Sequence, residues 1–280
     1  MNGPWRTVPL QNRIWRMSSQ EAFLARVRRA LHKDASPLPS RPPLWWSDTD
    51  MAEAATQLQT RLAAQRPALL AQVQQELDAA GGIVAYVHST PEAVAYITRL
   101  AQQKDAHLVV RWQSELLEAL EVDAALHQQG ITVHTTALPL GTVAGEATCT
   151  ATMTTWRREL RELLASADLG LSGVDYVIAE TGTLVLMARA GQIRGVSLLP
   201  PVHVAVARTS QVIATLADYL LLAQVAGVDP QQYLTSCVSF VTGPSRTGDI
   251  ELKLTVGVHG PGELHLVLLD EPAASRTADA

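Results

Sequence analysis

Short apolar runs alternate with amphipathic helical segments between residues 83 and 133. Ile83 to Val87 reads as a strand, and Thr90-Pro91 then supplies an N-cap and a first-turn proline for a helix. Leu108 to Val110 predicts a second strand, Glu115 to His127 a second helix, and Ile131 to Val133 a third strand. This is the period of βαβ units, whose right-handed crossovers build a doubly wound layer. The pattern therefore predicts an α/β fold with a mostly parallel sheet.

Helical and strand-like segments also follow in the rest of the chain. Trp156 to Ser166 has helical spacing, and no internal repeat is present. Five further apolar runs predict strands: Tyr176 to Ile178, Leu184 to Met187, Val202 to Val206, Cys237 to Val241 and Leu264 to Leu269. We expect the α/β domain to cover residues 81–270, with a tail at 271–280.

The sequence before residue 81 differs in composition. Residues 1–16 hold three arginines and no acid, and we expect a disordered leader there. Residues 17–80 predict an N-terminal helical arm that contains a proline-rich linker at Ser36 to Pro43. Within the arm, Asp50 to Ala80 has a helical pattern, which Pro67 is expected to divide into two helices.

Charge, cysteine count and hydropathy exclude several classes of function. The 22 basic and 27 acidic residues give a net charge of -5, so nucleic-acid binding is not expected. Cys149 and Cys237 cannot supply the four thiolates of an iron-sulfur cluster, and the dispersed histidines fit no metal site. No apolar run approaches the ~20 residues of a membrane span, and no signal peptide is recognisable. We expect a cytoplasmic protein whose sequence encodes no recognisable cofactor motif.

Polar residues directly after strands are the first candidates for a site, because open parallel sheets bind ligands beyond the carboxyl ends of their strands. Glu180 follows one such run and is a candidate catalytic base. The turn formed by Thr181, Gly182 and Thr183 offers amides and hydroxyls to an anion. The alternative is structural: Glu180 caps a neighbouring helix or pairs with an arginine.

His203 enters a strand after Pro200-Pro201 and is a candidate for orienting substrate or moving a proton. The competing interpretation is a buried core histidine whose ring nitrogens are satisfied by the backbone.

The richest loop follows the run that ends at Val241. Gly243 and Gly248 have the separation found in nucleotide-binding phosphate loops, but Asp249 stands where the lysine is needed, which argues against a triphosphate. We expect a monoanion such as a carboxylate or phosphate ester instead, unless the loop is only a structural turn. The candidates are Asp249 as a catalytic carboxylate and, for binding, Gly243, Ser245, Arg246, Thr247 and Glu251.

Several of these segments together resemble the lactate utilization protein C family, which carries the LUD domain. The resemblance runs from about Met17 to Asp270 and rests on Asp168 to Gly170, Asp175 to Leu186, Ser197 to His203, Gly243 to Glu251 and Gly257 to Pro261. The last segment adds His259 to the candidate binding residues. The resemblance implies a three-layer α/β/α sandwich like that of the sugar-phosphate isomerases and coenzyme A transferases. It also implies a part in oxidising L-lactate to pyruvate, alongside partner proteins that carry iron-sulfur clusters.

Two other functions remain open at this point. One is a stand-alone isomerase or coenzyme A transferase-like enzyme, with proton abstraction or acyl transfer at Glu180 on a small acid or phosphate ester. The other is a non-catalytic assembly module that uses the arm from Ser18 to Ala80 as its interface.

Overall fold

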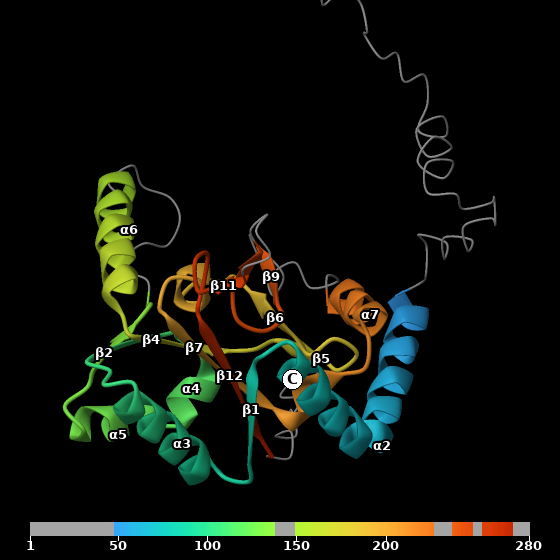
Figure 1. Cartoon of the computed structure of the whole chain (residues 1–280). Coiled ribbons are helices and arrows are strands. Elements are labelled where there is room, and N and C mark those ends of the chain that lie inside the picture. The colour runs from blue at the N-terminus through green and yellow to red at the C-terminus, as the bar shows by residue number, and fades with distance from the viewer. Residues whose placement is uncertain (1–47, 138–148, 227–236, 249–253, 271–280) are drawn as a thin grey trace, which may run out of the picture. The chain divides into compact units, whose positions relative to one another are not determined.

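The main sheet has six strands, all parallel, in the spatial order β1–β12–β7–β4–β2–β3 (Figure 1). The strand bounds are Ile83–Val87 (β1), Leu108–Arg111 (β2), Thr132–Thr135 (β3), Leu169–Gly173 (β4), Val202–Arg208 (β7) and Glu263–Leu269 (β12). The computed structural model describes residues 48–137, 149–226, 237–248 and 254–270, all within the compact unit Ser47–Ala280. The α/β class with a mostly parallel sheet is confirmed.

The middle strands carry the core. Every residue of β4 is buried, as are the first six residues of β7, which is typical of parallel strands covered on both faces. Strand β3 at one edge is mostly exposed. The registers pair Arg111 with Leu171 and Gly173 with Val206, so β2, β4 and β7 end side by side.

Six described helices accompany the sheet: α2 (Asp48–Ala79), α3 (Thr90–Gln103), α4 (Glu115–Ala119), α5 (Val122–Gln128), α6 (Cys149–Ser166) and α7 (Leu216–Ala226). Helices α3, α4 and α5 gather below the sheet in Figure 1, and α6 rises on the other side. Two short 3₁₀ turns are η1 (Arg194–Ser197) and η2 (Thr209–Gln211).

The single helix expected over Glu115 to His127 is wrong, because the chain forms α4 and α5 instead. Glu121 between them has a left-handed backbone, with φ of 53°. This break turns Leu117 before it and Leu126 after it into the core, where both are buried.

A second sheet holds three of the apolar runs that the sequence predicts as strands. It comprises β8 (Val212–Ile213), β5 (Tyr176–Ile178), β6 (Thr183–Met187) and β9 (Val238–Val241), in that spatial order. The β5–β6 and β6–β9 pairs are antiparallel. Strands β10 (Arg246–Gly248) and β11 (Leu254–Val256) form a separate antiparallel pair. Glu180 therefore lies in the turn of the antiparallel β5–β6 hairpin, outside the six-stranded sheet, although β5 also pairs in parallel with the short strand β8.

Helix α2 corrects the expectation for Pro67. The helix is continuous over 32 residues with Pro67 inside it. Its buried stripe packs onto β1, β8 and α7, and this packing holds the two halves in line across the proline. The stripe comprises Leu58, Leu62, Leu69, Val73 and Leu77. This end of the expected helical arm thus belongs to the same compact unit as the sheet.

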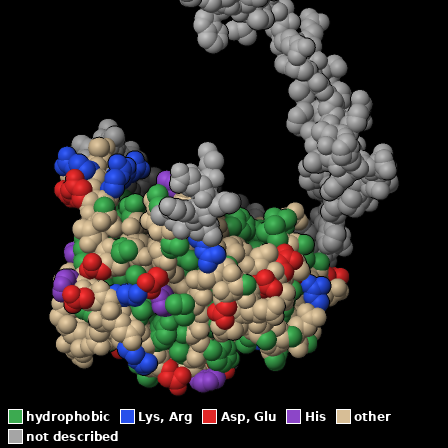
Figure 2. Space-filling view, in the orientation of Figure 1, with side chains coloured by type: hydrophobic (Ala, Val, Ile, Leu, Met, Phe, Trp, Pro, Cys, Tyr) green, Lys and Arg blue, Asp and Glu red, His purple; other side chains and the backbone are tan. Residues whose placement is uncertain are grey.

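None of the described helices is both long and apolar enough to cross a bilayer. On the face shown in Figure 2, acidic and basic side chains are interspersed over the described residues, without a broad field of one sign.

Candidate functional site

Two of the predicted turns lie against the end of α2. Gly182 has a φ of +61°, and a Cβ there would lie 2.6 Å from the backbone nitrogen of Leu77. Gly243 has a φ of +72°, and its Cβ would lie 2.5 Å from the carbonyl oxygen of Ala80. Both glycines are needed because the helix backbone passes so close to a left-handed turn.

Threonine hydroxyls join these turns to each other. Thr183 Oγ1 lies 2.7 Å from Thr181 Oγ1 and 2.6 Å from Thr242 Oγ1. The structure therefore brings together the Glu180 turn and the loop that leads to Arg246. Thr183 is buried, and its hydroxyl is occupied by the other two threonines.

Glu180 is exposed, and its Oε1 accepts a hydrogen bond from the backbone N–H of Leu216 at 2.8 Å. A carboxylate at this position satisfies an unpaired amide of α7 and interacts favourably with the helix dipole. This contact is a helix cap, which is the structural interpretation that the sequence left open for Glu180. The other carboxylate oxygen, Oε2, has no hydrogen-bond partner among the described residues.

The Arg246 loop is held by backbone and serine contacts. Ser245 donates its N–H to Pro261 O at 2.8 Å, and its Oγ accepts from the backbone N–H of His259 at 3.3 Å. Arg246 begins β10 with an exposed side chain, whose guanidinium lies against Gly81. Thr247 follows in the same strand and pairs with Thr255.

His259 contributes its backbone to this arrangement, and its side chain is exposed. Asp249 and Glu251 lie outside the described residues.

His203 is fully buried in β7. Its Nε2 lies 2.8 Å from Ser172 Oγ, while its Nδ1 has no hydrogen-bond partner. Burial, together with the nearby His265, lowers the pKa of His203 to about 3. The ring is therefore neutral at physiological pH. This matches the core interpretation, except that a serine hydroxyl and not the backbone satisfies the one bonded nitrogen.

A cavity of about 490 Å³ opens where β2, β4 and β7 end. Its lining residues lie at the ends of these strands or shortly after them, in the first turn of α4, or in the loop after β6: Trp112, Ser114, Glu115, Leu116, Gly173, Val174, Asp175, Arg189, Gln192, Arg208, Ser210 and Gln211. We refer to it as the carboxyl-edge cavity. None of these residues is a site residue predicted from the sequence, although their position directly after strands is the signal that could have identified the polar ones.

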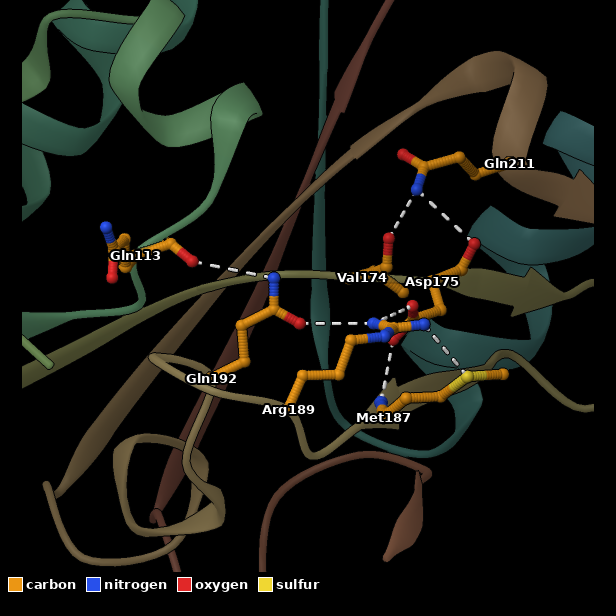
Figure 3. A network of polar contacts seen from close by, with 7 residues as sticks. All are labelled: Gln113, Val174, Asp175, Met187, Arg189, Gln192 and Gln211. Atoms are coloured by element: carbon orange, nitrogen blue, oxygen red, sulfur yellow. Dashed lines mark hydrogen bonds and ion pairs between the residues drawn. The ribbon is translucent and has the colours of Figure 1, made fainter. Parts of the chain in front are cut away.

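A network of polar contacts braces one wall of this cavity (Figure 3). Arg189 Nη1 donates to Asp175 Oδ1 at 2.6 Å and to Gln192 Oε1 at 3.1 Å. Asp175 Oδ2 accepts from the backbone N–H of Met187 at 2.7 Å. The Gln211 amide donates to the carbonyl oxygens of Val174 and Asp175. The ends of β4 and β7 are thereby fixed relative to the β6 loop.

A second polar chain lies at the opposite edge of the sheet. Tyr96 Oη lies 2.8 Å from His265 Nδ1, and His265 Nε2 lies 3.4 Å from Glu263 Oε2. Glu263 Oε1 accepts from Lys104 Nζ at 2.5 Å, and this hydrogen bond is the main cause that lowers the pKa of Glu263. Burial lowers the pKa of His265 against the opposing effect of Glu263. Because the carboxylate accepts from Nε2, the neutral ring accepts from Tyr96 at Nδ1.

Within the described residues, no three His, Cys, Asp or Glu side chains are grouped so as to hold a metal ion.

Comparison with known proteins shows where this chain has relatives. Residues 70–269 match the LUD domain family. An uncharacterized electron transport protein of Escherichia coli, YkgF, is 27% identical over 251 residues, which cover 78% of this chain and 51% of that protein. Lactate utilization protein B of Shouchella clausii is 28% identical over 235 residues, covering 72% and 48%.

Lactate utilization protein C of Halalkalibacterium halodurans is 38% identical over 102 residues, covering 36% of this chain and 44% of that protein. The chain thus spans about half the length of the curated relatives it matches. A crystal structure of a DUF162 family protein from Deinococcus radiodurans superposes with a TM-score of 0.48 and 19% identity, covering 73% of this chain and 98% of that one.

Proposed function

Because the chain belongs to the LUD domain family, we propose that it takes part in lactate utilization, as a component that acts with iron-sulfur partner proteins in oxidising L-lactate to pyruvate. The observation that carries this proposal is that relatives matching over most of this chain are named for lactate utilization and for electron transport. We also propose that this lactate-oxidising system is located in the cytoplasm.

The balance of the reaction explains why partners are needed. Lactate loses two electrons and two protons when its hydroxyl-bearing carbon becomes the ketone of pyruvate. A base can take a proton, but the electrons require an acceptor. With two cysteines, this chain cannot supply the four thiolates of a cluster, so the proposal assigns the electron carriers to partner chains.

For this chain the proposal assigns a small-anion site at the two joined turns. The exposed guanidinium of Arg246 would hold the carboxylate of the acid, with Thr247 beside it. Glu180 would act as base through Oε2, and Asp249, which follows Gly248 in the sequence, is a second proposed carboxylate. The hydrogen bond between Thr183 and Thr242 supports this assignment, because it ties the turn of Glu180 to the loop of Arg246.

Reconstitution tests the proposal. The isolated chain should not reduce a dye with lactate, whereas its mixture with purified iron-sulfur partners should. Arg246→Ala should lower kcat/KM of the mixture about tenfold or more, the loss expected for a charge-assisted contact of roughly 1.5–3 kcal/mol. Arg161→Ala, an exposed arginine on α6, is the matched control.

Each result has a defined meaning. Dye reduction by the isolated chain would contradict the role as a component. Full activity of the Arg246→Ala mixture would remove the anion site from the two turns while leaving the role in lactate utilization standing.

A further inference from the structure

Gly81 ends helix α2 in a motif that requires a left-handed residue. Its φ is +83°. The N–H of Gly81 donates to Asp78 O at 2.8 Å, and the N–H of Gly82 donates to Leu77 O at 2.9 Å. These two bonds form a Schellman motif, in which glycine is preferred just beyond the helix because it has no Cβ. The helix end therefore accounts for the glycine by conformation alone.

Gly130 ends helix α5 in the same motif, with a φ of +77°. Its N–H donates to His127 O at 2.9 Å, and the N–H of the next residue donates to Leu126 O at 3.1 Å. The two glycines differ in what lies beside them. A Cβ at Gly130 would have nothing within 4 Å, whereas a Cβ at Gly81 would lie 1.9 Å from Nη2 of Arg246 and 3.1 Å from its Cζ. Of these two helix ends, only that of α2 has a guanidinium in the space of a Cβ.

The position of this guanidinium suits its charge. It lies at the carboxyl end of a helix of 32 residues, where the partial negative charge of the helix dipole attracts a cation. Asp78 in the last turn accepts from Gln74 Nε2 at 2.7 Å, and no ion pair joins it to Arg246 in the described part of the chain. Close packing on Gly81 and the helix dipole therefore hold the guanidinium here.

This mode of support leaves the binding groups of Arg246 available. Within residues 48–137, 149–226, 237–248 and 254–270, its side chain forms no hydrogen bond and no ion pair. A supporting carboxylate would use some of the five N–H donors of the guanidinium and neutralise its charge. A glycine can support the group without doing either, so the donors and the charge remain for an anion.

We propose that Gly81 is a positioning residue of the small-anion site, because the absence of its side chain lets the Arg246 guanidinium lie against the end of α2. The same helix end contacts both turns of the site: Gly182 lies against Leu77, and Gly243 lies against Ala80. Helix α2 thereby sets the place of the guanidinium relative to the two turns. An arginine that is ordered before the ligand arrives loses less conformational entropy on binding. The inference rests on the proposed site and extends it to a third segment of the chain.

Side-chain NMR relaxation on the full chain tests the contact without any ligand. The heteronuclear NOE of the Arg246 Nε–H group, assigned by its absence in Arg246→Lys, should be high. Gly81→Ala and Gly81→Asn add a Cβ, so both should lower this NOE by about half or more. Asparagine tolerates a positive φ, so Gly81→Asn keeps the helix end folded while it displaces the guanidinium. Gly130→Ala and Gly130→Asn are the matched controls and should leave the NOE unchanged.

Kinetics of the reconstituted lactate assay test the consequence for binding. Gly81→Asn should raise KM for lactate at least about threefold and change kcat little, because Arg246 must then be ordered by the substrate itself. In an Arg246→Ala background the same substitution should have no further effect. Gly130→Asn should change neither constant.

An Arg246 NOE that neither Gly81 variant lowers would overturn the proposal. An equal decrease in the Gly130 variants would also overturn it, since the effect would then belong to helix ends in general. A KM effect of Gly81→Asn that persists without Arg246 would show that Gly81 acts by another route. If the mixture oxidises no lactate, the proposed function fails, while the NOE comparison still decides whether Gly81 positions Arg246.

Discussion

The carboxylate of Glu180 caps α7 by accepting the backbone N–H of Leu216, a residue 36 positions further along the chain. The contact ties the β5–β6 hairpin to α7. Nothing in the sequence around Glu180 predicts that this helix lies beside it. It gives this acid a structural role that exists beside any chemical one.

The two roles of Glu180 make different predictions for two substitutions. Glu180→Ala removes the cap and should lower the free energy of unfolding by about 1 kcal/mol. Glu180→Gln keeps an acceptor oxygen and should retain most of that stability, but it cannot act as a base. Urea denaturation measures the first effect and the reconstituted lactate assay the second. A Gln variant with full activity would leave Glu180 as a cap alone.

Gly182→Ala should lower the free energy of unfolding by more than the cost of placing an alanine at a positive φ. The reason is that the added methyl group also meets the backbone of Leu77. Gly130→Ala isolates the backbone cost: Gly130 has a φ of +77° and nothing within 4 Å of its Cβ position. We expect the Gly182 variant to lose at least about 1 kcal/mol more than the Gly130 variant in urea denaturation. Equal losses would show that α2 can move away from the turn.

Acid should destabilise the fold through His203. Burial lowers its pKa from 6.5 to about 3, so between these pH values the unfolded chain binds a proton that the folded chain does not. Stability should therefore fall as pH drops from about 6.5, by about 1.4 kcal/mol per pH unit for this one group. His203→Gln places an amide nitrogen near the Nε2 position and should flatten this part of the stability profile. An unchanged slope would assign the acid sensitivity to other groups.

Tyr96→Phe should cost about 1–3 kcal/mol, because it leaves the buried Nδ1 of His265 without its donor. Tyr86→Phe is the matched control: Tyr86 is 42% exposed on β1, and its hydroxyl interacts with Asp270 at the surface, where water can replace it. Thermal unfolding of both variants at neutral pH gives the comparison. A Tyr96 variant as stable as the control would mean that water replaces the hydroxyl.

The sequence predicts where strands lie far better than which sheet they join. The bounds expected for Ile83 to Val87 and Tyr176 to Ile178 are those of β1 and β5. A three-residue apolar run such as β5, however, has the same pattern in a parallel or an antiparallel sheet. Its partner is decided by packing with β6 and β8, which no local signal encodes.

In the candidate site, too, single loops can be predicted from the sequence, but the residues that become their neighbours in space cannot. Thr183 and Gly243 are predicted from the sequence as binding residues of two separate polar loops, and the contact between Thr183 and Thr242 that joins these loops is seen only in the structure. The carboxyl-edge cavity escaped prediction because Ser114, Gly173 and Ser210 are single residues in three distant segments. Only the strand order β7–β4–β2 makes them neighbours.

The parallel pairing of β1 with β12 joins the first and last strands of the described sheet. During synthesis, β1 leaves the ribosome long before Leu264 to Leu269 exist, and β7 likewise waits for β12 on one side. The nascent chain must therefore carry apolar strands with open edges until its last strand emerges. Pairings so distant in sequence fold slowly. A stop codon before Glu263 should consequently yield an aggregating fragment and not a shortened domain.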